Sequence, residues 1–302
     1  MVTGTTFGIG DLAKRTGVPV RTIRFYCDEG LLETVRSGGG HRRFDATAVE
    51  RLNLVRRLRG LGLGLRSITD VLAGQRSLDE AVAAERAALD REVATLVWRR
   101  SALRAVEEAP PADRAGRLEL LAAVQDGFAA HDILVRLWRP MTTGPIPPDT
   151  ASMFLDISAP RPPELPTPAQ VVAYAELVRL AADRALARDL RASTLVDHER
   201  IADLGALHAA VGAACELASP QVAAGAPPAP GAALDRFVAA HATALGTADT
   251  PEFRRRLNRR TAADRQPRLR RYWHLAGEIT GEPAPTGVTH TWLLDALDRS
   301  VA

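Results

Sequence analysis

Basic and aromatic side chains gather near the N-terminus of this 302-residue chain in a pattern suited to binding a polyanion. Arg21 and Arg24 fall about one helical turn apart beside an aromatic pair, and a glycine-rich segment then leads to Arg42 and Arg43. A guanidinium group binds phosphate oxygens through paired hydrogen bonds, and it reads the edge of guanine in the same way. These residues therefore predict contact with double-stranded DNA.

The surrounding sequence predicts the elements that would carry these side chains. A short helix over residues 9–16 should end at Gly17, and a second helix should cover residues 19–30. Two strands, over residues 31–35 and 41–44, would form a hairpin around the glycines. A helix, a tight turn, a second helix and a basic hairpin make a winged helix-turn-helix, which places its second helix in the major groove.

A long helix is predicted further along the chain. Asp45 should cap a third helix, and the capping-box pair Ser77 and Glu80 should open a helix that continues to Glu108. Apolar residues repeat in this helix with a period near seven, which predicts a coiled-coil dimer. The alternative is a single helix packed on the C-terminal part of the same chain. The candidate dimerisation residues are Val82, Leu89, Val93, Leu96 and Leu103.

Several short segments of the N-terminal region match one known family in order and spacing. Residues 7–72 resemble the DNA-binding domain of the MerR family of bacterial transcriptional regulators, a resemblance that covers about a quarter of the chain. The matching segments are Ile9-Gly10-Asp11-Leu12-Ala13, Thr16-Gly17-Val18, Thr22-Ile23-Arg24-Phe25-Tyr26, Gly30-Leu31-Leu32, Gly40-His41-Arg42-Arg43-Phe44 and Leu58-Arg59-Gly60-Leu61-Gly62.

The resemblance implies a homodimer, joined by an antiparallel coiled coil and bound to a palindromic promoter operator. It implies that the activated protein bends and untwists an overlong promoter spacer, which realigns the promoter elements for RNA polymerase. It also implies phosphate contacts from Arg24 and Tyr26, with a core position as the alternative for Tyr26. The expected DNA-binding residues are Thr16, Val20, Arg21, Thr22, Arg24, Tyr26, His41, Arg42 and Arg43.

Two features depart from the family pattern. Cys27 stands where the family usually has glutamate, and its thiol is expected to be a small buried side chain, with a redox role as the alternative. His41 and Arg43 replace commoner wing residues and make this wing more basic.

The sequence predicts an all-α fold apart from the small two-stranded wing. The apolar periodicity after the long helix is helical, and alternating runs typical of strands are missing. We expect a DNA-binding domain at residues 1–76, a dimerisation helix at residues 77–109 and a helical regulatory domain at residues 117–302. Within the last part, residues 140–168 should form an irregular connection, and residues 194–218 should form one helix.

Aromatic residues scattered through the C-terminal domain predict a site for a small organic ligand between its helices. Packing of these rings in an ordinary core is the alternative for each of them. The alternative function is a ligand-independent regulator whose C-terminal domain binds another protein. The candidate pocket residues are Phe128, Trp138, Tyr174, Tyr272, Trp273 and Trp292.

Other types of site are not expected. The two cysteines, Cys27 and Cys215, lie far apart and are too few for a thiolate metal site or an iron–sulfur cluster. We find no pairing of a nucleophile with a base, so we expect no catalytic residues, no cofactor and no enzyme fused to the DNA-binding domain. His274 and Glu278 share a helix face, but two ligands alone make a weak metal site.

The charge distribution agrees with a DNA-binding N-terminus. Residues 1–76 carry 13 Lys and Arg against 7 Asp and Glu, whereas the remaining residues carry 26 against 29. A positive N-terminal end attracts phosphate. The arginine-rich run over residues 254–271 is expected to be a solvated surface, with binding of an anion or of additional DNA as the alternative. The sequence shows neither a signal segment nor a membrane-spanning run, so we expect a cytoplasmic protein.

Overall fold

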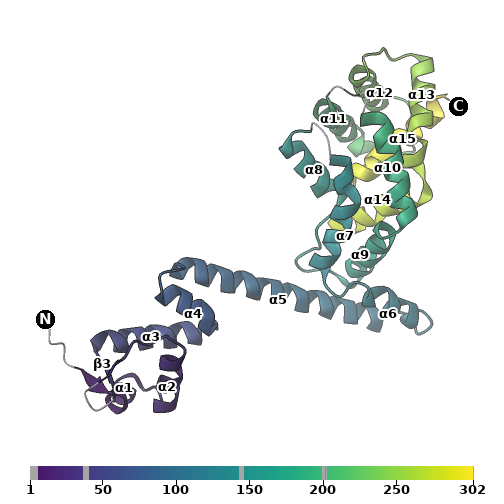
Figure 1. Cartoon of the computed structure of the whole chain (residues 1–302). Coiled ribbons are helices and arrows are strands. Elements are labelled where there is room, and N and C mark those ends of the chain that lie inside the picture. Colours follow the sequence, from purple (N-terminus) through teal and green to yellow (C-terminus); the bar gives the residue numbers. More distant parts are fainter. Residues whose placement is uncertain (1–5, 37–40, 143–145, 199–200, 202, 302) are drawn as a thin grey trace. The chain divides into compact units, whose positions relative to one another are not determined.

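The computed structural model divides the chain into two compact units, residues 1–93 and 94–302 (Figure 1). Among the described residues, nearly all regular structure is helical, with one small sheet near the N-terminus, as the sequence predicts. Helix α5 (Leu78–Glu107) begins in the first unit and ends in the second. The described residues are 6–36, 41–142, 146–198, 201 and 203–301.

The helix-turn-helix of the first unit forms at the predicted positions. Gly17 ends α1 with a φ of 67° and donates its N–H to the carbonyl of Ala13 at 2.8 Å, a left-handed conformation that glycine adopts without strain. Asp45 caps α3 by accepting a hydrogen bond from the N–H of Ala48 at 3.1 Å. The four helices of this unit before α5 are α1 (Ile9–Thr16), α2 (Val20–Asp28), α3 (Ala46–Gly60) and α4 (Leu65–Leu72).

The wing is smaller than predicted, and a third strand joins it. Strand β3 (Arg42–Phe44) lies between β2 (Val35–Arg36) and β1 (Phe7–Gly8), and both pairings are antiparallel. The predicted strand over residues 31–35 is wrong for its first four residues, because the two leucines that begin it are buried in the domain core. The predicted glycine turn at residues 37–40 lies outside the described residues.

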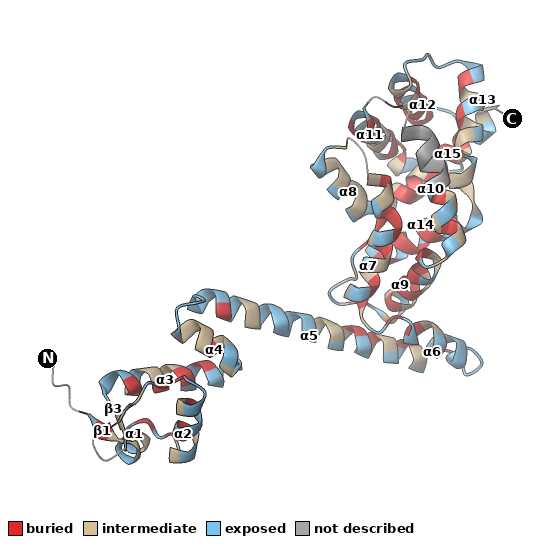
Figure 2. Ribbon diagram, in the orientation of Figure 1, coloured by how far each residue is buried: buried red, intermediate tan, exposed pale blue. Residues whose placement is uncertain are grey.

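An apolar core holds the helices of the first unit in fixed orientations (Figure 2). Leu12 of α1, Ile23 of α2, Leu52 and Val55 of α3 and Ile68 of α4 are all fully buried in it. Removing this much aliphatic surface from water is the main stabilising term for such a domain. The core therefore fixes α2, and with it the direction of every side chain that α2 exposes.

All the regular structure described in the second unit is helical. The prediction of an irregular connection over residues 140–168 is wrong for residues 148–158, because Pro148 occupies the first turn of helix α8 (Pro148–Ser158), where a missing N–H costs nothing. Residues 159–167 have no regular structure, as predicted. The other elements are α6 (Arg114–Ala122), α7 (Gly127–Trp138), η1 (Arg139–Thr142), α9 (Pro168–Ala181), α10 (Arg184–His198), α11 (Leu204–Ala223), α12 (Ala232–Ala244), α13 (Pro251–Arg260), η2 (Thr261–Arg265), α14 (Pro267–Thr280) and α15 (Thr286–Val301).

The single helix predicted over residues 194–218 is also wrong. Helix α10 continues to His198, and α11 begins only at Leu204. Asp203 starts α11 by accepting a hydrogen bond from the N–H of Ala206 at 2.8 Å. An aspartate in this N-cap position favours a helix start, so the boundary falls where the local capping chemistry places it.

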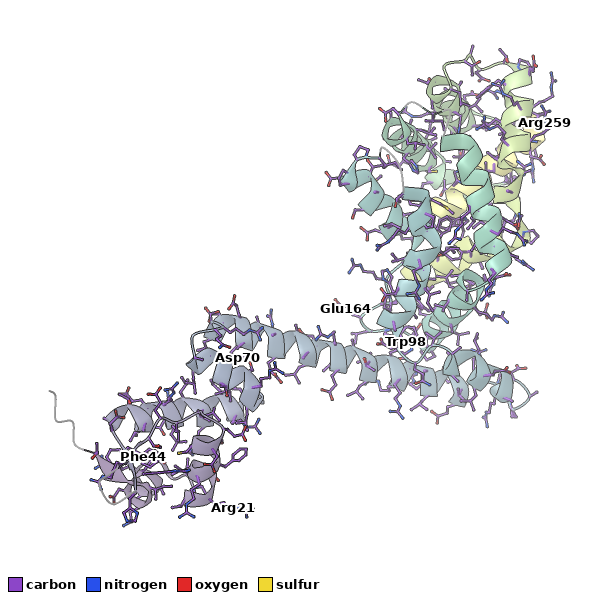
Figure 3. All side chains as sticks on the ribbon, in the orientation of Figure 1. Arg21, Phe44, Asp70, Trp98, Glu164 and Arg259 are labelled. Carbon is purple, nitrogen blue, oxygen red and sulfur yellow. The ribbon has the colours of Figure 1, made fainter. Side chains whose placement is uncertain are left out.

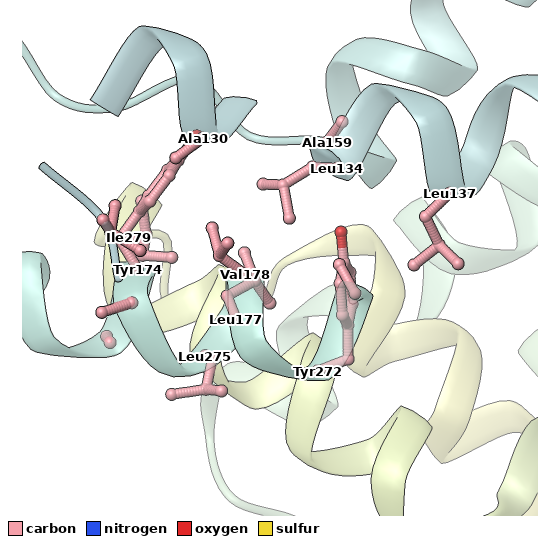
Figure 4. Close-up of a cluster of buried hydrophobic side chains, with 14 of the residues drawn as sticks. Ala130, Leu134, Leu137, Ala159, Tyr174, Leu177, Val178, Tyr272, Leu275 and Ile279 are labelled. Atoms are coloured by element: carbon pink, nitrogen blue, oxygen red, sulfur yellow. The ribbon is translucent and has the colours of Figure 1, made fainter. Parts of the chain in front are cut away.

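Two tyrosines lie at the centre of the largest core of the second unit, between α7, α9 and α14 (Figure 4). Tyr174 donates to the carbonyl of Pro160 at 3.1 Å, and Tyr272 donates to the carbonyl of Ser158 at 2.6 Å. The indole N–H of Trp138 donates to the hydroxyl of Tyr272 at 2.8 Å. These buried polar atoms therefore have hydrogen-bond partners within the core, as stable burial requires.

Candidate nucleic-acid interface

Helix α2 presents two arginines on a rigid support. Ile23 and Tyr26 anchor one face of the helix in the core, with 0% and 9% of their surfaces exposed. Arg21 (labelled in Figure 3) and Arg24 are exposed, and within the described chain neither guanidinium has a protein partner. Phe25, which follows Arg24 in the chain, is 46% exposed. Two exposed guanidinium groups and an exposed aromatic ring on one helix fit contact with a nucleic acid.

The remaining predicted residues of the first two helices are less accessible. Val20 and Thr22 are half-buried. Thr16 is 3% exposed, and its hydroxyl donates to the carbonyl of Leu12 at 2.7 Å. Arg56 of α3 donates to the carbonyl of Thr16 and so ties the end of α1 to the body of the domain. Thr16 has a structural position in this domain, which disfavours the predicted contact with DNA.

The wing carries its basic side chains in defined positions. Arg42 donates to a carboxylate oxygen of Asp28, at the end of α2, at 2.7 Å. Arg43 donates to the carbonyl of Thr6 at 2.8 Å. His41, which precedes them, is exposed. Asp28 and Thr6 are not predictable as partners from the sequence, because contacts across 14 and 37 residues leave no local signal in it.

The thiol of Cys27 lies beside this ion pair. Partial burial raises its pKa above the usual value, and this effect outweighs the opposing influence of the Arg42 guanidinium. A thiol needs a lowered pKa to be a reactive thiolate at neutral pH. The environment of Cys27 therefore fits a packed side chain better than a redox centre.

Helix α5 uses two opposite faces. Trp98, Ser101 and Ala105 lie on a face buried in the second unit, where the indole of Trp98 donates to the carbonyl of Val124 at 3.1 Å. At 3.6 residues a turn, positions 96 and 103 fall on the other side of the helix. The predicted dimerisation residues are exposed there, by 40% at Val82, 48% at Leu89, 58% at Val93, 58% at Leu96 and 64% at Leu103.

The predicted pocket residues do not all come together. Trp138 contacts Tyr272 and Trp273, with ring centroids 5.5 and 5.0 Å apart. Tyr174 packs instead on Trp98 at 5.4 Å. Trp292 belongs to a different core, between α11, α12 and α15, and donates to the carbonyl of residue 226 at 2.8 Å. The side chain of Phe128 lies outside the described residues.

The arginine-rich run over residues 254–271 is largely paired with acidic groups. Arg254 binds Asp235 and Asp249, which lowers the pKa of the Asp249 carboxyl, and Arg270 binds Asp295. Further ion pairs join Arg265 to Asp298, Arg268 to Asp183 and Arg271 to Glu176. Pairing of this extent favours a structural surface over binding of an anion.

The described residues hold no set of three or more His, Cys, Asp or Glu side chains placed to bind a metal ion. Within that same part of the chain, no helix is both long and apolar enough to cross a membrane.

Comparison with known proteins identifies the first unit. Residues 7–75 match the family described as MerR HTH family regulatory protein. The chain is 38% identical over 97 residues to nodulation protein NolA of Bradyrhizobium elkanii, covering 32% of this chain and 44% of NolA. It is 40% identical over 75 residues to the HTH-type transcriptional regulator HmrR of Rhizobium leguminosarum bv. viciae, covering 25% of this chain and 58% of HmrR.

A third relative is the HTH-type transcriptional regulator ZntR of Escherichia coli K12, at 38% identity over 68 residues, or 22% of this chain and 48% of ZntR. The chain thus spans about half the length of these curated relatives. No solved structure matches it. The matching region contains α1, α2, the wing, α3 and α4, the elements that carry the exposed arginines. The N-terminal part of the chain is therefore a helix-turn-helix domain of the MerR family.

Proposed function

We propose that the protein is a transcriptional regulator that binds a palindromic promoter operator as a homodimer. The observation that carries this proposal is the pair of exposed arginines on α2, which have no partner among the described residues. Helix α2 itself is held in the core of a MerR-type domain. Arg21 and Thr22 at the start of α2 contact bases or phosphates, while Arg24 and the wing contact the backbone. Bending and untwisting of the operator then adjust the promoter for RNA polymerase.

The dimer forms through the exposed apolar face of α5. The five apolar residues from Val82 to Leu103 lie on that face and are 40–64% exposed in the single chain. A large unpartnered apolar stripe with this spacing is stabilised by a second helix. Antiparallel pairing presents two recognition helices to two half-sites, which matches a palindromic operator.

The second unit is the regulatory part and binds a small organic ligand. The support for this is the group of contacting rings formed by Trp138, Phe154, Tyr272 and Trp273. One observation favours the alternative of a ligand-independent protein-interaction module, since the hydroxyl of Tyr272 and the indole N–H of Trp138 are already hydrogen-bonded inside the core. A thermal shift caused by one class of compound, together with a reciprocal change in DNA affinity, would favour the ligand sensor.

Selection of bound sequences from a random duplex pool, using the full-length protein, tests the DNA-binding function. On the selected operator, Arg24→Ala should weaken binding about tenfold. The slope of log affinity against log salt concentration should fall by the amount expected for about one phosphate contact. Arg255→Ala is the matched control, because Arg255 is also exposed but belongs to the second unit. Enrichment of no sequence, or equal affinity of both variants and the wild type at matched salt, would contradict the proposal.

A further inference from the structure

An ion pair in the DNA-binding domain joins the two elements that are expected to contact DNA. Arg42 lies on the wing strand β3, and Asp28 is the last residue of α2. A guanidinium nitrogen of Arg42 lies 2.7 Å from a carboxylate oxygen of Asp28, and this hydrogen bond holds the pKa of Arg42 above its usual value. The two side chains remain 35% and 62% exposed, so a phosphate group can reach the same guanidinium.

The negative charge of Asp28 does not stabilise helix α2, because Asp28 lies at the C-terminal end of the helix. The C-terminal end of a helix carries a partial negative charge, which disfavours a carboxylate there. Helix α2 has no basic residue in its last turn to offset this effect. The partner that stabilises the Asp28 carboxylate is Arg42, from a different element.

We propose that Asp28 is a competitor for DNA phosphate at Arg42, which weakens binding to DNA of arbitrary sequence. This inference rests on the proposed function. In the free domain the carboxylate holds the guanidinium of Arg42, and a backbone phosphate must displace it. The exchange replaces one anion by another at Arg42. It therefore lowers the free energy that the wing contributes to DNA binding. Binding then depends more strongly on contacts made by α2, which include those that can read bases.

The test measures affinity of the full-length protein for a duplex of arbitrary sequence, because such binding comes from phosphate contacts. Asp28→Asn keeps the shape of the side chain and removes its charge. Glu29→Gln is the matched control, since Glu29 is the next residue, is exposed and has no side-chain partner in the described part of the chain. Both variants remove one negative charge from the same end of α2, but only the first releases Arg42.

We expect Asp28→Asn to bind several-fold more tightly than Glu29→Gln, with a salt dependence greater by about one phosphate contact. Equal gains in the two variants would overturn the proposal, because the effect would then come from overall charge. Weaker binding by a folded Asp28→Asn variant would also overturn it and would show that the ion pair positions the wing for DNA.

A second comparison, made without the Arg42 guanidinium, tests whether the gain in affinity of Asp28→Asn acts through Arg42. In an Arg42→Gln background, Asp28→Asn and Glu29→Gln should change affinity equally, because the competition no longer exists. A persistent extra gain from Asp28→Asn in that background would overturn the proposal. Failure of the wild type to bind any duplex at low salt is a different result, which rejects the proposed function itself. Thermal unfolding of each variant verifies that the domain is folded.

Discussion

Single residues in the second unit show how closely its helices are packed. Gly287 of α15 faces the ring of Trp273 on α14, and a Cβ atom at this glycine would lie 2.0 Å from the nearest ring carbon. No side chain fits at that distance, so the two helices approach as closely as they do because residue 287 is glycine. Trp273 in turn packs against Trp138.

Gly287→Ala should therefore destabilise the second unit, by about 1–3 kcal/mol, because the added methyl group forces the ring or the helix to move. Gly212→Ala in α11 is the matched control, since nothing lies within 4 Å of a Cβ atom there. The control should be stabilising by about 0.5–1 kcal/mol, as expected when alanine replaces glycine inside a helix. Urea unfolding of both variants measures the difference, and equal stabilities would contradict this account of the packing.

The sequence predicts the side-chain positions of the DNA-binding domain better than those of the candidate pocket. Arg21 and Arg24 are exposed as expected, because their positions follow from the periodicity of one short helix. Asp28 could not be found as the partner of Arg42, since that contact depends on how the wing folds back onto α2. For the same reason, the predicted pocket residues combine rings from two separate cores, since a sequence does not show which helices pack together.

At the scale of whole elements, local chemistry decides which predictions succeed. The capping box predicted for α5 is confirmed, with Glu80 accepting from the N–H of Ser77 at 2.8 Å and Ser77 accepting from the N–H of Glu80 at 3.1 Å. Helix boundaries in the second unit were harder to predict. Prolines that read as interruptions, such as Pro148, instead begin helices.

The exposed face of α5 gives a prediction about assembly. Replacing Leu89 and Leu96 together by aspartate should convert a dimer into a monomer of 32.4 kDa, because buried charges at a coiled-coil seam are strongly unfavourable. Leu165→Asp is the control, since Leu165 is 75% exposed but lies outside α5. Sedimentation measures the mass, and operator affinity should fall together with dimerisation. A dimer that survives the double substitution would place the interface elsewhere.

At the scale of the whole molecule, two buried histidines should make the second unit less stable in acid. His241 of α12 and His290 of α15 both have a pKa lowered to about 4, chiefly by burial and further by neighbouring histidines, including His208 of α11. The Nε2 atom of His241 is buried without a hydrogen-bond partner in the described structure. Below the unfolded-state pKa of about 6.5, these histidines bind protons in the unfolded chain but stay neutral in the folded unit.

The stability of the second unit should thus be complete above about pH 6.5 and fall as the pH drops towards 4, by up to about 3 kcal/mol for each histidine. All four tryptophans lie in residues 94–302, so their fluorescence during urea unfolding reports on this unit alone. His241→Gln should reduce the loss between about pH 7 and pH 4.5. His274→Gln, at a side chain that is 67% exposed, should leave it unchanged. A flat pH profile in the wild type would contradict the prediction.

The two opposite faces of α5 also constrain how the length of this chain can change. One extra residue between Leu89 and Trp98 would rotate everything after it by about 100° relative to everything before it. Val82 and Leu89 would then fall out of phase with Trp98, Ser101 and Ala105. Seven extra residues restore the phase to within about 20°. Insertions, deletions and chimeras that join this DNA-binding domain to another regulatory domain should therefore be tolerated only in steps of whole heptads.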